Sequence, residues 1–262
     1  MSSIVTDQGI VHYETYGQGK PVVLLHGWLG SWGLWQRTME LLGRSYRTYA
    51  LDFWGFGESG KKRETYAVGD FVTLVDQFMD KLGIESAPVV GHSMGGTVSL
   101  SMAFRFPRRV QKVVVVGSPI VGSSLNILLQ LAGYRPIAFV VYNLPIILRL
   151  GLRAFSPLIV NHDPLGWYHM QERDLSKTTL ESFFASIGSL QRTDLRPRLA
   201  EVKMPTLGIY GAGDTIVHPR QYEALKAGVS QAEIEIMHGS RHFPMIDEPE
   251  HFNRVLKDFL DR

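Results

Sequence analysis

Ser93 stands at the centre of the pentapeptide Gly-His-Ser-Met-Gly, between an apolar run at residues 87–90 and a helix-compatible run at residues 97–106. A strand, a tight turn and a helix in this order place a serine hydroxyl at the apex of the turn, where it can act as a nucleophile. Glycine suits positions 91 and 95 because a side chain two residues from the apex would collide with neighbouring backbone. The pentapeptide alone also fits an ordinary glycine-rich turn. The residues elsewhere in the chain therefore decide whether Ser93 is a nucleophile.

A nucleophilic serine needs a base, and the base needs an acid that orients it. Asp214 follows the apolar run at residues 206–210, and His242 follows the alternating run at residues 232–237. Each lies on a glycine-containing loop just past the end of a predicted strand. Because the carboxyl ends of parallel strands lie along one edge of a sheet, we expect Ser93, Asp214 and His242 to meet there.

The rest of the chain predicts an α/β fold with a mostly parallel eight-stranded sheet that carries helices on both faces. Helical patterns alternate with strand patterns over most of the sequence. Strands are predicted at residues 3–7, 10–16, 21–25, 46–51, 87–91, 112–117, 205–210 and 232–237. Helices are predicted near residues 34–42, 66–82, 94–106, 218–227 and 249–260.

The alternation stops after the sixth strand. Apolar segments separated by proline and glycine predict helices at residues 125–131, 136–144, 145–155 and 175–190. We therefore expect two domains, a core of residues 1–120 and 195–262 and a helical cap of residues 121–194. The cap is expected to lie over the catalytic edge and to select the substrate, with Phe139, Tyr142 and Phe155 as candidate pocket residues.

Composition narrows the function classes. A net charge of +2 gives no bias toward nucleic acid, and the absence of cysteine excludes disulfides and thiolate metal sites. Nine histidines show no metal-ligand spacing, so neither a metal nor a cofactor is expected. Prolines and arginines interrupt the apolar stretch at residues 137–160, which argues against a transmembrane helix, although adhesion to a membrane surface stays open. No secretory signal is visible, so a cytoplasmic location is expected.

These motifs resemble the α/β-hydrolase fold superfamily, of the serine esterase and lipase type. The resemblance covers about residues 1–120 and 195–262. It includes the Ser, Asp, His order, the His-Gly-Trp turn at residues 26–28 and the Asp-x-x-Gly-x-Gly-x-Ser segment at residues 52–59. It implies that the backbone N–H groups of Trp28 and Met94 form the oxyanion hole. Asp52 is the rival candidate for the acid, but the resemblance implies that it organises its loop. The alternative position for the acid holds Ser118, which has no carboxylate.

The resemblance implies a carboxylic ester hydrolase that acts through an acyl-enzyme on short- to medium-chain or aromatic esters. Ser93 at the elbow argues against haloalkane dehalogenases and epoxide hydrolases, which carry aspartate there. The alternatives are a carbon–carbon bond hydrolase, a perhydrolase, which the His-Gly-Trp turn resembles, or another acyl-transfer enzyme. A ligand-sensing receptor of the same fold is a further alternative. His238 is the second candidate for the base, whereas His26, His92 and His218 are expected to have structural roles.

Overall fold

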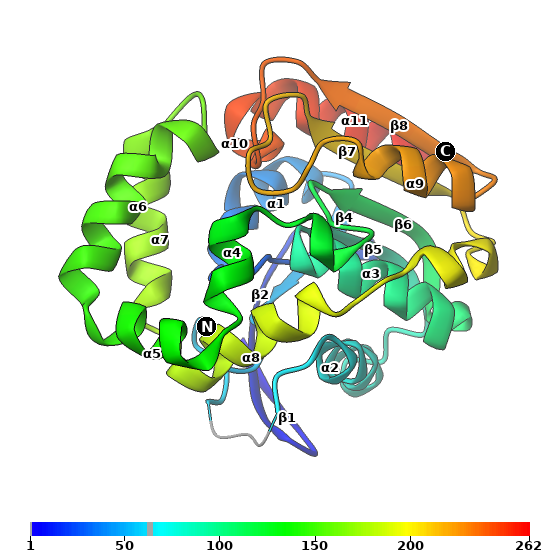
Figure 1. Cartoon of the computed structure of the whole chain (residues 1–262). Helices are drawn as coiled ribbons and strands as arrows, with labels where there is room; N and C mark the ends of the chain where they lie inside the picture. Colours follow the sequence, from blue (N-terminus) through cyan, green and yellow to red (C-terminus); the bar gives the residue numbers. More distant parts are fainter. Residues whose placement is uncertain (1, 62–64) are drawn as a thin grey trace.

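A single eight-stranded sheet forms the centre of the protein (Figure 1). The computed structural model describes residues 2–61 and 65–262. The strand order is β1-β2-β4-β3-β5-β6-β7-β8, and β1, β2 and β4 pair antiparallel whereas β4 to β8 pair in parallel. The strands are β1 (Ser2–Thr6), β2 (Gly9–Tyr16), β3 (Lys20–Leu25), β4 (Tyr46–Leu51), β5 (Ala87–His92), β6 (Val110–Val116), β7 (Thr206–Gly211) and β8 (Ala232–Met237).

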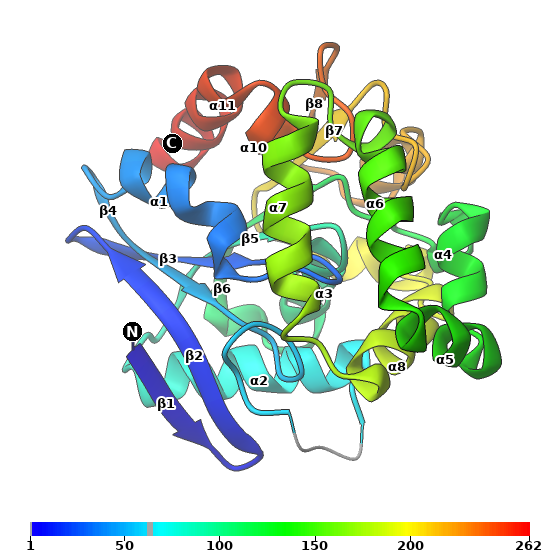
Figure 2. The same cartoon turned by 90° about the vertical axis from the view of Figure 1, so that its left-hand side faces the viewer.

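The two faces of the sheet are covered by different helices (Figure 2). Apolar side chains of α2 (Val68–Lys81), α3 (Met94–Arg105) and α9 (Gln221–Gly228) join the core cluster on one face. Those of α1 (Gln36–Leu42) and α11 (Pro249–Asp261) join the cluster on the other. Since both faces of the central strands are buried, β5 is buried along its whole length, which explains why it reads as a continuous apolar run.

The predicted fold class is confirmed, and the predicted strands agree with the observed ones to within two residues at each end. The predicted helices of the sheet-covering layers also exist, although the first is preceded by a 3₁₀ turn at Trp32–Trp35. α9 begins later than expected, at Gln221. A short helix, α10 (Pro244–Asp247), precedes α11.

Five helices lie between β6 and β7. They are α4 (Ile127–Ala132), α5 (Arg135–Asn143), α6 (Pro145–Ile159), α7 (Pro164–Leu175) and α8 (Leu180–Gln191). The prediction missed α7, which Asp163 caps by accepting a hydrogen bond from the N–H of Gly166. It also began the last helix too early, because Thr179 caps α8. Among the described residues, no helix is long and apolar enough to cross a membrane.

Candidate active site

Ser93 lies at the apex of a strained turn between β5 and α3. Its φ of 51° and ψ of −118° fall where non-glycine residues are uncommon. Its N–H donates to the carbonyl oxygen of Val116 at 2.8 Å, which anchors the turn to the neighbouring strand. A Cβ added at Gly91 would lie 2.1 Å from the carbonyl oxygen of Gly95, and one added at Gly95 would lie 2.4 Å from that of Leu25. The turn therefore requires glycine at both positions, as the sequence indicated.

Asp214 and His242 form a buried pair at the ends of β7 and β8. The imidazole Nδ1 of His242 lies 2.8 Å from Oδ2 of Asp214, and both side chains are at most 5% exposed. The other carboxylate oxygen of Asp214 accepts the N–H groups of Ile216 at 2.8 Å and Val217 at 2.9 Å. With Asp214 fixed by its own loop and holding Nδ1, Nε2 is the nitrogen of His242 left for proton transfer.

Ser93 and His242 line the same cavity, whose volume is about 110 Å³. The wall opposite them comes from helices between β6 and β7. Most of the lining is apolar, and among the described residues that line it none is a lysine or an arginine. The side chains that those helices contribute are Leu129 of α4, Leu152 and Ile159 of α6, and Trp167, Met170, Gln171 and Asp174 of α7.

Phe139, Tyr142 and Phe155, which the sequence suggested as pocket residues, do not line this cavity. Phe139 and Phe155 are exposed, and the hydroxyl of Tyr142 donates to the carbonyl oxygen of Thr178. Apolar composition alone does not tell the buried face of a helix in this segment from its outer face. The sequence analysis did not predict α7, and this helix supplies four of the residues that line the cavity.

The turn after β3 lies beside Ser93 and presents backbone donors. Trp28 of this turn lines the cavity, and Met94 is the first residue of α3. The backbone N–H groups of Trp28 and Met94 do not donate to any backbone carbonyl of the described residues. Leu29 has a φ of 58°, so this turn is also strained. His26 holds the turn from behind: its Nδ1 donates to the carbonyl oxygen of Gly27 at 2.7 Å, and its Nε2 accepts the N–H of Phe53 at 2.9 Å.

Two buried histidines near the site are structural. Burial lowers the pKa of His26 from its ordinary value, which keeps the imidazole neutral in the tautomer that its two hydrogen bonds require. Burial also lowers the pKa of His92, and the nearby His242 lowers it further. His92 Nε2 donates to the carbonyl oxygen of His242 at 2.9 Å and so positions the backbone of that residue. His218 and His238 are exposed, so neither joins the cavity.

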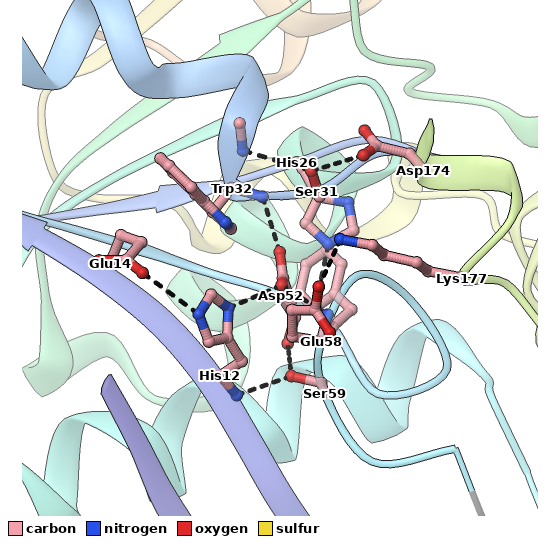
Figure 3. A network of polar contacts seen from close by, with 12 residues as sticks. His12, Glu14, His26, Ser31, Trp32, Asp52, Glu58, Ser59, Asp174 and Lys177 are labelled. Atoms are coloured by element: carbon pink, nitrogen blue, oxygen red, sulfur yellow. Dashed lines mark hydrogen bonds and ion pairs between the residues drawn. The ribbon is translucent and has the colours of Figure 1, made fainter. Parts of the chain in front are cut away.

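Asp52, the rival candidate for the acid, organises a separate polar network (Figure 3). It accepts hydrogen bonds from the N–H of Trp32 at 2.7 Å and of Glu58 at 3.0 Å, and it pairs with His12 Nδ1 at 2.9 Å. Burial acts to raise the pKa of Asp52, but the hydrogen bond from His12 and the other partners outweigh it and lower the pKa overall. Asp52 therefore ties β2, the 3₁₀ turn that precedes α1 and its own loop together.

Asp174 is a site residue that sequence reasoning missed. It lies on α7, is 2% exposed and lines the cavity. Its Oδ1 accepts from the hydroxyl of Ser31 at 3.0 Å, whereas its buried Oδ2 has no hydrogen-bond partner among the described residues. Burial raises the pKa of Asp174 to about 6. The sequence signal that could have found it is Asp163-Pro164, which is typical of a helix start and so predicts α7. On that helix Gln171 and Asp174 are three residues apart and therefore lie on one face.

Comparisons with known proteins identify the family of the chain. The family model for the alpha/beta hydrolase fold matches residues 20–139. A 2-hydroxy-6-oxononadienedioate/2-hydroxy-6-oxononatrienedioate hydrolase of Paraburkholderia xenovorans is 31% identical over 95% of this chain and 90% of its own length. A putative carbamate hydrolase, RutD, of Serratia proteamaculans is 26% identical over 95% of this chain and 96% of its own length.

Solved structures show the same fold. A thermophilic esterase from Thermogutta terrifontis superposes with a TM-score of 0.86 at 21% identity, over 99% of this chain and 97% of that one. A meta-cleavage product hydrolase, CumD, superposes with a TM-score of 0.80 at 22% identity, over 99% and 97%. The chain belongs to the α/β-hydrolase fold family. By that membership it is a hydrolase.

Proposed function

We propose that this protein is a carboxylic ester hydrolase whose catalytic residues are Ser93, His242 and Asp214. The observation that carries the proposal is a serine in a strained turn that shares a cavity with a histidine already paired to a buried aspartate. None of these residues needs such an arrangement for stability, and strained backbone is typical of active sites. No group of three or more histidine, aspartate and glutamate side chains that could hold a metal ion occurs in the described part of the chain.

In the first step the hydroxyl oxygen of Ser93 attacks the ester carbonyl carbon while Nε2 of His242 takes the hydroxyl proton. Asp214 holds the imidazole by Nδ1 and offsets the positive charge of the imidazolium. When the tetrahedral intermediate collapses, the proton passes to the leaving alcohol and the acyl group stays on Ser93. A water molecule that His242 deprotonates then attacks the acyl-enzyme, which releases the acid and restores the serine.

The oxyanion of each intermediate is proposed to accept the backbone N–H groups of Trp28 and Met94. Met94 begins α3, so the partial positive charge of the helix N-terminus adds to its N–H. The strained turn at Leu29 and the hydrogen bonds of His26 fix the second donor before the substrate binds. Such preorganised donors are each worth about 3–4 kcal/mol of barrier.

The helical segment of residues 121–194 is proposed to act as a cap that selects the substrate. Leu152, Trp167 and Met170 give the cavity a mostly apolar wall, which favours a short- to medium-chain or aromatic acyl group. The cavity volume of about 110 Å³ favours the shorter acyl chains. A small-molecule ester without a net charge suits this cavity best, because among the described residues that line it Asp174 is the only carboxylate and none is a lysine or an arginine.

A carbon–carbon bond hydrolase is the second candidate, because the Paraburkholderia relative carries the name of a dienedioate hydrolase. A dienedioate carries carboxylate groups, which need cationic or hydrogen-bonding partners when they are buried. No lysine or arginine lines the cavity among the described residues, and Asp174 would repel a substrate carboxylate. The cavity therefore favours the ester reaction.

The test is a panel of p-nitrophenyl esters from C2 to C16, with a 2-hydroxy-6-oxodienoate as the competing substrate. We expect turnover of the C2 to C8 esters, loss of turnover in Ser93→Ala, and covalent labelling of Ser93 by a fluorophosphonate. His238→Ala is the matched control for His242→Ala, because His238 is exposed. Faster turnover of the dienoate than of every ester, or activity that survives in Ser93→Ala, would overturn the proposal.

A further inference from the structure

The exposed apolar side chains of this protein are concentrated on one surface. Of the fourteen large apolar side chains that are exposed in the described part of the chain, ten lie between residues 127 and 158. We call the outer surface of residues 127–158, which form α4, α5, α6 and the turns between them, the apolar surface. Its six most exposed members are Ile127, Tyr134, Phe139, Val140, Ile146 and Leu150, each between 55% and 71% exposed. Because α5 contacts both α4 and α6, these side chains gather on adjoining helices, and an exposed apolar surface of this kind marks an interaction site.

The charges on this surface have one sign. Arg135, Arg149 and Arg153 are exposed on α5 and α6, and residues 86–162 contain no aspartate or glutamate. Arg149 is paired with Glu172 on α7, whereas Arg135 packs over the ring of Phe184 and Arg153 has no carboxylate partner among the described residues. Apolar side chains interspersed with arginines, on three helices that carry no acid of their own, are complementary to an anionic lipid surface.

The helices have the right size to lie on a bilayer and not to cross it. α5 has nine residues and α6 has fifteen, whereas a spanning helix needs about twenty. Figure 2 shows α4, α5 and α6 gathered on one side of the molecule, opposite β1 and β2. The whole apolar surface can therefore contact one membrane, and the long arginine side chains can reach the headgroups.

We propose that α4, α5 and α6 dock on an anionic lipid bilayer. The same helices wall the cavity: Leu129, Leu152 and Ile159 line it, while Ile146 and Leu150 face outward. A docked molecule therefore has its cavity wall against the acyl chains of the membrane. If the proposed ester hydrolysis holds, on which this part of the inference rests, the substrates are apolar esters taken from the bilayer.

Binding is tested on the Ser93→Ala variant of the full chain, so that catalysis plays no part. Flotation with phosphatidylcholine vesicles that contain 30% phosphatidylglycerol should carry the protein up, and pure phosphatidylcholine should bind it more weakly. The triple change Phe139→Ser, Ile146→Ser and Leu150→Ser should lower the partition coefficient more than about 100-fold, because each removes a large apolar contact. The change Arg135→Gln with Arg153→Gln should lower it about 30-fold on anionic vesicles only.

The matched control replaces Val5, Ile10 and Tyr16 by serine, because these are exposed apolar residues on the opposite side of the molecule. It should bind as the unchanged protein does. No binding to anionic vesicles, equal binding to neutral ones, or equal loss in the control would overturn the proposal. So would a dimer that the triple change dissociates, because the apolar surface would then join two copies of this chain.

Turnover separates this inference from the proposed function. In the active protein the triple and arginine variants should hydrolyse soluble p-nitrophenyl acetate at the unchanged rate. The unchanged protein should hydrolyse an ester carried in anionic vesicles faster than these variants do. Vesicle binding without any ester hydrolysis would leave the docking intact and refute the proposed function. Ester hydrolysis without vesicle binding would do the reverse.

Discussion

Replacement of Asp174 by asparagine should stabilise the folded protein at neutral pH. The folded state holds the pKa of this carboxyl at about 6, against an ordinary value of 3.8. The folded state therefore binds the proton more tightly than the unfolded chain, so stability falls as the pH rises from about 3.8 to about 6. Above that window the charged carboxylate costs about 3 kcal/mol, from about 1.4 kcal/mol for each of roughly two pKa units.

An asparagine keeps the size of the side chain and an oxygen that can accept the hydroxyl of Ser31. It carries no charge, so it removes the cost of burial without creating a cavity. The variant should therefore exceed the unchanged protein in free energy of unfolding by about 3 kcal/mol at pH 8 and by only about 1 kcal/mol at pH 4.5. Other titrating groups are common to both proteins and cancel in this difference.

The assay is urea unfolding at pH 4.5, 6 and 8, followed by the fluorescence of the five tryptophans. Glu172→Gln is the control, because this carboxylate lies on the same helix in a partly exposed pair with Arg149. Its change should stay below about 1 kcal/mol. A difference between Asp174→Asn and the unchanged protein that does not vary with pH, or that shrinks as the pH rises, would refute the reasoning.

Three further predictions follow from the same geometry. Asp214→Asn should reduce kcat less than Ser93→Ala does, since the orienting acid is the least damaging loss in such a set; equal kcat values would contradict the assignment. Gly91→Ala should lower the free energy of unfolding by more than about 3 kcal/mol in a denaturant titration, because the added Cβ would lie 2.1 Å from a carbonyl oxygen. Gly151→Ala is the control: its Cβ would meet nothing within 4 Å, so this change should be neutral or stabilising. Leu152→Phe should shift the ester preference toward C2 and leave acetate turnover within a few-fold; an unchanged C2-to-C16 profile would show that this wall does not read the acyl chain.

The sheet and the elbow could be predicted because their sequence signals are local. Each central strand is a continuous apolar run, and steric exclusion at Gly91 involves the backbone of Gly95, only four residues away. The approach of His242 to Asp214 also followed from local signals, because both residues lie on loops that follow neighbouring parallel strands at the same edge of the sheet. Where the chain obeys a short-range rule, sequence and structure agree.

The walls of the cavity obey no such rule. Leu152 and Phe155 lie three residues apart on α6, yet one lines the cavity and the other is exposed, and only the packing of α6 on α7 decides which. The burial of Asp174 also depends on helix packing. Its pKa is raised because α7, the helix that carries it and that the sequence pattern did not reveal, buries its carboxyl group. We therefore propose that substrate choice depends on the contacts between the helices inserted after β6, where substitutions should change specificity while the Ser93 turn stays intact.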